Sequence, residues 1–208
     1  MIPELRSRFN ADFNEAAYAQ LLSQLESRCG GPIQFRVAET PIFVSTGLLD
    51  DMAEKGALLA LHLIDSSIYL AAARRAIPKG FEVANETAHP HFLTADFALV
   101  REGSGGLVPR LVEIQAFPSV FAYQAELCAA YREVFGLPQA LGVFLGGLND
   151  STYWDLLRRT IIGDHHPENV VLTEIDPLHQ KTFPDFYVTS QRLGIAVVDI
   201  TSLEPVGN

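Results

Sequence analysis

The sequence predicts an α/β protein with a helical N-terminal third, a central β-hairpin and a C-terminal βαβ unit. Apolar residues recur at helical spacing in the first third of the chain, and two runs rich in Val, Leu, Ile and Phe flank a glycine-rich segment in the middle. Near the end, two short apolar runs enclose another helical pattern. With 48% hydrophobic residues in 208, the chain is long and apolar enough to bury a core.

Two helical patterns fill the N-terminal third. The first, "NEAAYAQLLSQLESRCGG", places Leu21, Leu22 and Leu25 on one face, and Gly30–Gly31 supplies its stop. The second, over residues 47–77, predicts one long helix or two helices joined near residues 65–67. Pro78 and Gly80 end it, because proline cannot continue a helix.

The middle of the chain predicts a hairpin and then a helix. Residues 91–103 and 107–117 have the β-branched and aromatic composition of strands, and residues 103–106 form the turn. A corner at Phe117-Pro118-Ser119 leads into a helical pattern that stops at Gly136.

The last third predicts a helix followed by a βαβ unit. The helix covers residues 151–162 and begins with Asp150 or Ser151 as its cap. The strands "ENVVLTEI" and "IAVVDI" read as buried and flank a helix, so we expect a parallel pair with Asp176 and Asp199 at the strand ends. A composition change near residue 146 divides the chain into portions 1–146 and 147–208, which can also form one continuous domain.

Charge and composition exclude several classes of protein. The net charge is −10 and no run of Lys or Arg occurs, which argues against a general nucleic-acid binder. No apolar run is long enough to span a bilayer, and "MIPELRSRFN" is too charged to be a signal peptide. We therefore expect a cytoplasmic protein without a nucleic-acid or membrane partner, and with Cys29 and Cys128 as buried, reduced thiols.

The sequence stops at "DITSLEPVGN", directly after a predicted buried strand. No helix follows to cover that strand. This ending predicts a fragment of a longer protein, in keeping with the usual size of α/β domains.

A candidate site lies on the predicted hairpin. Glu113 and Gln115 are two residues apart and share one face of their strand, and pairing brings Asp96 near Glu113. A charged group inside an apolar run is costly to bury unless a cation or hydrogen bonds satisfy it. The group predicts a site for a hard cation such as Mg2+ or for a substrate amine, and the alternative is a solvent-facing side of the sheet.

The run "LTADFALVREGSGGLVPRLVEIQAFPS" resembles the N-terminal region of ATP-grasp ligases of the glutathionylspermidine synthase and glutathione synthetase type. The matching positions are Asp96-Phe97, the strand Leu111 to Gln115 and the turn Pro118-Ser119. The tail "TEIDPLHQKTFPDFYVTSQRLGIAVVDITSLE" is similar to the βαβ unit of the pre-ATP-grasp region. The resemblance covers about half of the chain.

The resemblance implies a carboxylate–amine ligase that uses ATP and Mg2+. Glu113 would be a metal ligand, while Asp96, Gln115 and Ser119 would orient the substrate or a metal-bound water. Tyr123 is a candidate for lining the substrate pocket, although packing alone also explains it. The family has Asn where this chain has Gln115, and the added methylene disturbs octahedral Mg2+ geometry.

The remaining phosphate and metal ligands of the family come from the ATP-grasp half, and no G-x-x-x-x-G-K-[ST] loop occurs here. We therefore do not expect this chain alone to turn over ATP. The alternative function is a stand-alone α/β domain for small-molecule binding or assembly. A homodimer formed over the terminal strand fits either function.

Other candidate metal ligands are less favoured. His89 and His91 are close in sequence and Glu86 is near them, but Pro90 and the lack of a clear third ligand favour a surface loop.

Overall fold

The computed structural model describes residues 2–87, 89–103, 105–116, 119–204 and 206. The chain is a mixed α/β protein whose helices and strands form two compact units. Unit 1 comprises residues 1–6 and 42–118, and unit 2 comprises residues 7–41 and 119–208. The boundary expected near residue 146 stays a prediction.

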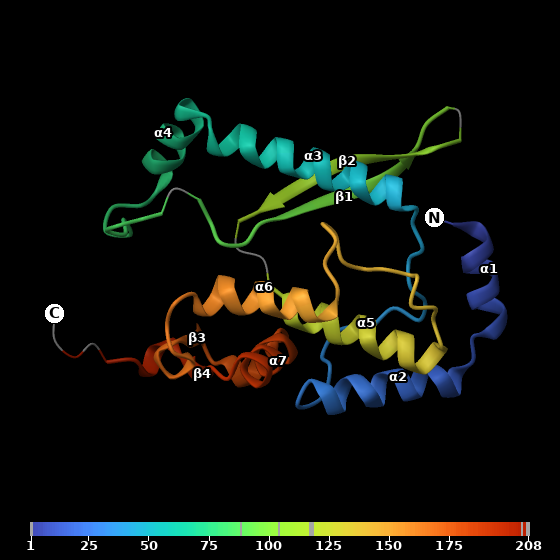
Figure 1. Ribbon diagram of the computed structural model, residues 1–208. Helices are drawn as coiled ribbons and strands as arrows, with labels where there is room; N and C mark the ends of the chain where they lie inside the picture. The colour runs from blue at the N-terminus through green and yellow to red at the C-terminus, as the bar shows by residue number, and fades with distance from the viewer. Residues whose placement is uncertain (1, 88, 104, 117–118, 205, 207–208) are drawn as a thin grey trace. The chain divides into compact units, whose positions relative to one another are not determined.

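In unit 1, a helix pair accompanies a two-stranded sheet (Figure 1). The sequence predicted either one long helix or two helices over residues 47–77. The structure has two, helix α3 (Thr46–Ile64) and helix α4 (Ser67–Ala76). Each begins with a serine cap, since the side chain of Ser45 accepts from the N–H of Leu48 and that of Ser66 from the N–H of Tyr69.

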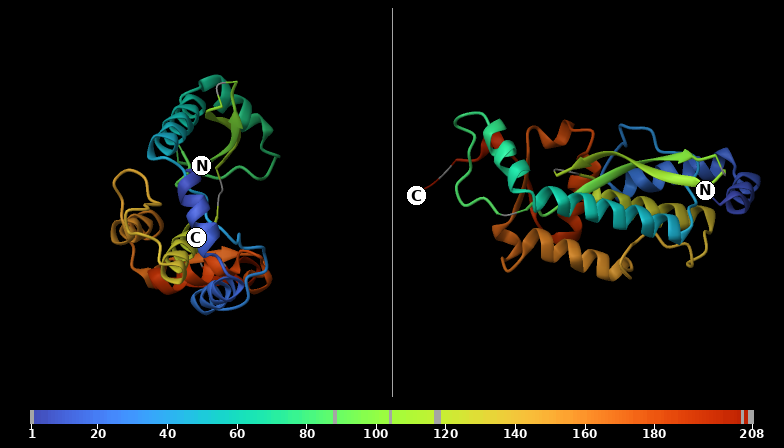
Figure 2. Two further views of the ribbon diagram at one scale, coloured as in Figure 1. Left: turned by 90° about the vertical axis from the view of Figure 1, so that its right-hand side faces the viewer. Right: turned by 90° about the horizontal axis from the view of Figure 1, so that it is seen from above.

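The strands of unit 1 are β1 (Thr94–Arg101) and β2 (Leu107–Gln115), which pair antiparallel as predicted. Figure 2 shows the strong twist of this hairpin. Helix α3 lies against one of its faces, and Gly56 permits the approach, because a Cβ there would lie 3.1 Å from that of Ala95.

Unit 2 is built around three packed helices, α2 (Glu15–Arg28), α5 (Phe121–Phe135) and α7 (Phe183–Leu193). Their shared core contains Leu21, Leu25 and Cys29 from the first helix and its end, together with Ala130 and Val188. Helix α2 ends at Arg28 with Cys29 as its cap, and the next residue, Gly30, has a left-handed φ of 75° and leaves no room for a Cβ against the ring of Tyr187. Glycine is therefore required there on two counts.

Two further helices flank this core. Helix α1 (Pro3–Asp12), which the sequence patterns did not predict, buries Phe9 against Phe135 with ring centroids 4.8 Å apart. Helix α6 (Asp150–Ile162) was predicted with the wrong cap. Asn149 is the cap, because its side chain accepts from the N–H of Thr152 and its own N–H donates to the Thr152 hydroxyl.

The C-terminal strands β3 (Val171–Glu174) and β4 (Ala196–Asp199) form a parallel pair, as the βαβ pattern predicted. The prediction that both strands are buried was wrong. Val171 is 45% exposed and Ala196 is exposed as well, because two strands with one packed helix leave much of the sheet in solvent. Short 3-10 turns lie at Pro167–Asn169, Pro177–His179 and Ile200–Ser202.

Within the described residues, no single helix has the length and apolar composition to cross a membrane. Helices α3 and α4 meet that test only as a pair, and the chain bends by 73° between them.

Candidate functional site

The hairpin of unit 1 brings three of the predicted site residues together. Asp96 pairs directly with Glu113, and Thr94 pairs with Gln115, so their side chains share one face of the two-stranded sheet. The register shifts between Asp96 and Phe97, which is a β-bulge at Val112. Beyond the bulge, the side chain of Phe97 lies on the α3 side, near Gly56.

A single amide joins the two carboxylates on the polar face. The Gln115 side-chain nitrogen lies 2.9 Å from Oδ2 of Asp96 and 2.8 Å from Oε1 of Glu113. An ionised carboxylate only accepts hydrogen bonds, so the amide can satisfy both acids only through its N–H2 group. The arrangement is thus a pair of acceptors converging on one donor.

The three side chains differ in exposure. Glu113 is exposed, whereas Asp96 and Gln115 are partly buried. The expected cost of burying a charge at Glu113 is therefore small, because water still reaches the carboxylate.

The donor chemistry of this face suits a cation. Carboxylate oxygens are preferred ligands of Mg2+, which often takes one or two of them and completes its shell with water and phosphate oxygens. Among the residues that the structure describes, no group of three or more His, Cys, Asp or Glu side chains could hold a metal ion. Asp96 and Glu113 therefore fit Mg2+ as a partial ligand set, and they fit an ammonium group at least as well.

Ser119 and Tyr123 belong to unit 2 and not to the hairpin. Ser119 is exposed and directly precedes Val120, the N-cap of α5. The other two residues of the predicted corner, Phe117 and Pro118, lie outside the described residues.

Tyr123 is a core residue of unit 2. It is 4% exposed, and its ring meets that of Phe35 edge-on at 5.3 Å. Burial raises the pKa of its phenol, and its hydroxyl oxygen has no hydrogen-bond partner among the described residues. Packing explains this position, and a part in substrate binding stays a prediction.

The start of α5 is occupied by an internal anion that the sequence did not indicate. The carboxylate of Asp185, in the first turn of α7, accepts from the N–H of Val120 at 3.1 Å and from that of Tyr123 at 2.9 Å. Val120 has φ of 67°, a left-handed conformation that is rare for a β-branched residue. Helix N-termini bind anions, and here the bound anion is supplied by the chain itself.

Burial is the main influence on Asp185. The residue is buried, and this desolvation raises the pKa of its carboxyl group, although backbone N–H groups of α5 act in the opposite direction. Hydrogen bonds from the backbone N–H groups of α5 offset the free-energy cost of burying this carboxylate.

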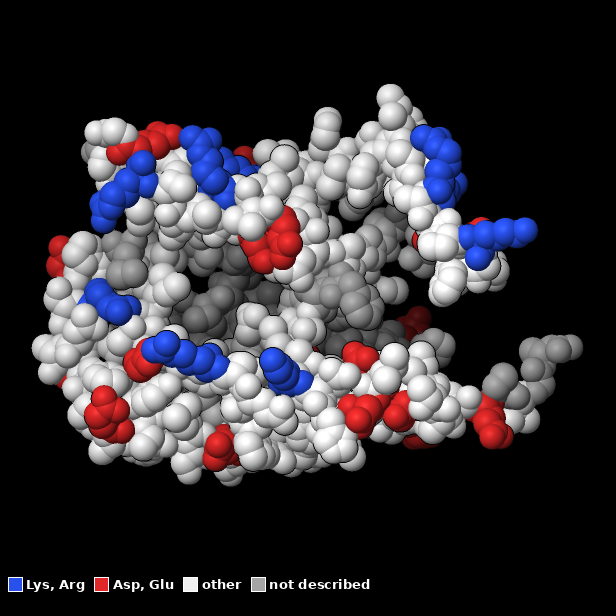
Figure 3. Space-filling model, turned by 180° about the vertical axis from the view of Figure 1, so that it is seen from behind, with Lys and Arg blue, Asp and Glu red and all other residues white. Residues whose placement is uncertain are grey.

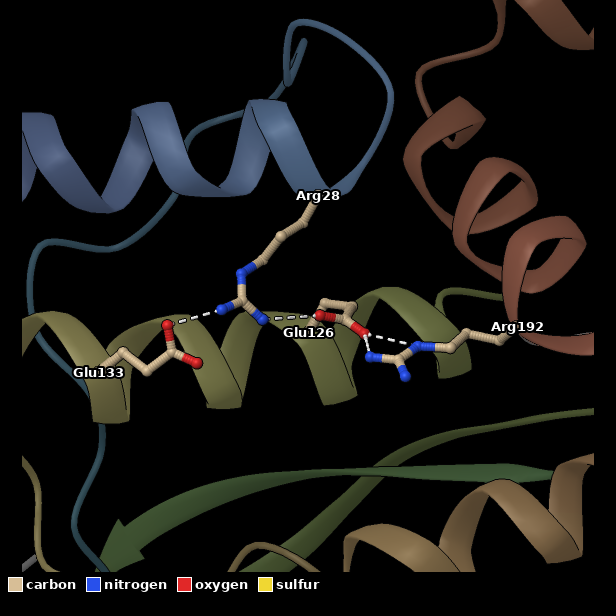
Figure 4. Close-up of polar contacts among 4 residues, drawn as sticks. All are labelled: Arg28, Glu126, Glu133 and Arg192. Carbon is tan, nitrogen blue, oxygen red and sulfur yellow. Dashed lines mark hydrogen bonds and ion pairs between the residues drawn. The ribbon is translucent and has the colours of Figure 1, made fainter.

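A second buried carboxylate, Glu126, lies between two arginines (Figure 4). Arg28 of α2 approaches one of its oxygens at 2.9 Å, and Arg192 of α7 binds the other. Arg28 also reaches Glu133 at 2.7 Å, and the Arg192 guanidinium lies 4.9 Å from the centroid of the Trp154 ring. These contacts connect the three core helices of unit 2.

The two cysteines are unpaired, as expected. Cys29 is fully buried, and burial raises the pKa of its thiol to about 12. Cys128 is only partly buried, which corrects the prediction for that residue. Neither thiol has the lowered pKa of a nucleophilic cysteine.

The remaining candidate metal ligands are not part of any metal-binding group among the described residues. His89, His91 and Glu86 lie in an exposed segment between α4 and β1. At the ends of the parallel strands, Asp176 pairs with His179 at 2.7 Å, while Asp199 accepts from the N–H of Asp176 and from Thr201. Local hydrogen bonds account for both carboxylates.

Comparison of the chain with protein-family models, with curated proteins and with solved structures gave no match.

Proposed function

We propose that this chain is the substrate-side portion of an ATP-grasp-like carboxylate–amine ligase, and that the hairpin face of Asp96, Glu113 and Gln115 receives the amine. One observation carries the proposal. A nitrogen donor, the Gln115 amide, already lies within hydrogen-bond distance of both carboxylates. The sequence resemblance to the glutathionylspermidine synthase type supplies the reaction class.

An ammonium group would use the same acceptors more strongly than the amide does. Hydrogen bonds between two charged partners are shorter and about twice as strong as neutral ones. Glu113 is exposed and Gln115 is partly buried, so an incoming ammonium can displace the amide without breaking core packing. We infer that Gln115 holds the two carboxylates in place until the substrate amine replaces it.

Mg2+ and ATP belong to the proposed whole enzyme. The resemblance gives Glu113 an alternative use as a metal ligand, which would exclude the amine from that carboxylate, and the role of Ser119 in orienting the substrate stays a prediction. When bound, the metal would stabilise charge on a transferring phosphoryl group. The chain's own residues bind and orient the amine, and no G-x-x-x-x-G-K-[ST] loop occurs in its sequence.

The binding test uses the 208-residue chain and a linear diamine, putrescine, followed by calorimetry and NMR chemical shifts. We expect Glu113→Gln and Asp96→Asn each to weaken binding at least about tenfold, because each removes one charge-assisted hydrogen bond. Glu102→Gln is the matched control, since Glu102 is an exposed carboxylate of the same hairpin that pairs with Arg110. Equal loss in all three variants, or no binding by the parent chain, would overturn the amine proposal.

A stand-alone binding or assembly domain is the second candidate. It is favoured by Gln115 itself, which stands where the family has Asn and turns its N–H2 group, not its oxygen, toward the carboxylates. Titration with Mg2+ and ATP separates the two candidates. Binding of putrescine without any Mg2+-dependent effect of ATP, in the longest form of the protein that cells produce, would favour the binding domain.

A further inference from the structure

Helix α4 has no buried residue. Ile68 is 84% exposed, Tyr69 is 47% exposed and Leu70 is 37% exposed. Large apolar side chains scattered singly on a surface are ordinary, but here Ile68 and Tyr69 lie on one side of a short helix whose other residues on that side are all alanine. This helix therefore presents an apolar surface for which unit 1 offers no cover.

The side chains of α4 are sorted around its axis. At 100° per residue, one side contains Ile68, Tyr69, Ala72, Ala73 and Ala76 and is wholly apolar, and the opposite side contains Ser67, Leu70, Ala71, Arg74 and Arg75. The preceding half of α3 extends the apolar surface, because Leu58 and Leu61 are exposed while Gly56 and Ala60 are buried. A sorted helix of this kind is typical of an element that lies at an apolar boundary.

Charged residues are nearly absent from the second half of α3 and the first part of α4, and basic residues follow them in the sequence. Between Lys55 and Arg74 the only charged residue is Asp65, and then Arg74, Arg75 and Lys79 follow without an acid until Glu82. In Figure 3, the α4 end of unit 1 shows blue side chains on a mostly white surface. A chain of net charge −10 thus concentrates positive charge beside its most exposed apolar helix.

We propose that α4, with the C-terminal half of α3, lies in the surface of an anionic membrane. Interfacial helices bury an apolar side among lipid headgroups and place Lys and Arg on the phosphate side. Phe81 and Val83, both strongly exposed just beyond Lys79, would add apolar anchors. The net negative charge of the rest of the chain opposes this little, because at physiological salt charges more than about 8 Å away are screened.

We favour a lipid surface over a groove on another protein because of Arg74, Arg75 and Lys79. An acidic phosphate layer complements all of them at once, and a lipid surface needs no shape to match the bend between α3 and α4. The proposal replaces the expectation from composition that no membrane partner exists. That expectation rested on the lack of a spanning segment and of a signal peptide, and neither excludes a helix that lies in a membrane surface.

Flotation of the whole chain with vesicles tests the proposal. Phosphatidylcholine vesicles are compared with phosphatidylcholine vesicles containing phosphatidylglycerol, each at low and high salt. We expect binding only to the anionic vesicles, with loss at high salt. The double change Arg74→Gln with Arg75→Gln should reduce partitioning about thirtyfold, since each cation near such a surface contributes about 1 kcal/mol.

The chain offers matched controls for both parts of the surface. Arg158 and Arg159 form an equivalent exposed pair on α6, so neutralising them should leave vesicle binding unchanged. Ile68→Ser should weaken binding, whereas Ile175→Ser, at another strongly exposed isoleucine, should not. Circular dichroism of each variant checks that α4 still forms.

Three outcomes would overturn the proposal. The parent chain could fail to float with anionic vesicles. The α6 pair could matter as much as the α4 pair, which would indicate diffuse charge attraction. Light scattering could reveal a dimer that Ile68→Ser dissociates, in which case a second copy of the chain, and not lipid, covers α4.

Discussion

Asp185 shows how one residue of α7 completes another helix. The first N–H groups of α5 have no partner within their own helix, and the left-handed Val120 provides no side-chain cap. Asp185 supplies both oxygens to this end, from a position 62 residues beyond Tyr123. The start of α5 therefore depends on a tertiary contact and not on a local signal.

Replacing Asp185 should destabilise unit 2. Asp185→Ala leaves the N–H groups of Val120 and Tyr123 without an acceptor, and we expect it to lower the free energy of unfolding by about 1–3 kcal/mol. Asp185→Asn keeps the shape and one acceptor oxygen, so its loss should be smaller. Urea denaturation of the three proteins measures both effects.

The pH dependence of Asp185 has a defined sign. Because burial raises the pKa of its carboxyl group, the folded chain holds the proton more tightly than the unfolded chain above about pH 4. The contribution of this group to the free energy of unfolding should fall as pH rises through that window. Asp185→Asn cannot titrate, so the parent chain should lose stability relative to it with rising pH, and a gain would contradict the assignment.

At the scale of elements, the sequence was most informative where local chemistry decides. Helix α5 ends at the predicted Gly136, α2 ends two residues before the predicted Gly30, and the two strands of the hairpin flank the predicted turn. Helix α1 was missed because its sequence is polar and buries only Phe9. The exposure of β3 could not be predicted, since the apolar pattern of a strand does not say how many strands will cover it.

Local sequence patterns also predicted part of the candidate site on the hairpin. Alternation along a strand places Glu113 and Gln115 on one face, but the turn length alone would set Asp96 opposite Val112, and the register shift sets it opposite Glu113. The bulge at Val112 left no local sequence signal, and the orientation of the Gln115 amide is set by its hydrogen bonds to Asp96 and Glu113. Asp185 and Glu126 gave no sequence signal, because their partners lie 62 to 98 residues away.

The three core helices of unit 2 meet at Glu126, which gives a prediction for their packing. Glu126→Gln leaves Arg28 and Arg192 without the carboxylate between them. Breaking a fully buried pair costs about 3–5 kcal/mol, and the partial exposure of both arginines reduces this to roughly 2 kcal/mol. Thermal or urea unfolding would measure the loss.

Glu133→Gln is the control for that change. Glu133 binds the same Arg28 but is exposed, so its removal should cost less than about 1 kcal/mol. Equal losses in the two variants would mean that Glu126 contributes no more than an exposed ion pair.

At the scale of the whole molecule, the two units differ in how much they bury. Among the described residues of unit 1, only Phe43, Gly56, Ala60 and Pro109 are buried. Unit 2 contains a continuous apolar cluster from α2, α5 and α7. Local stability follows buried contacts, so the two units should open with different free energies.

Hydrogen exchange followed by mass spectrometry should resolve this difference. We expect the slowest backbone amides in α2, α5 and α7, and amides of α4 among the fastest of any helix. The reason is that opening α4 exposes no buried side chain. Protection of α4 equal to that of α5 in the isolated chain would contradict this and would indicate a cover for its apolar side.

The bond from Asp185 to the start of α5 also sets an order for folding during synthesis. A ribosome adds residues from the N-terminus at about 5–20 per second, so α2 and α5 emerge seconds before residue 185. Until then, α5 can pack against α2 through Leu21, Leu25 and Ala130, but its first turn lacks its anion. The nascent helix should therefore begin frayed at Val120 and become fixed there only when the last quarter of the chain has been made.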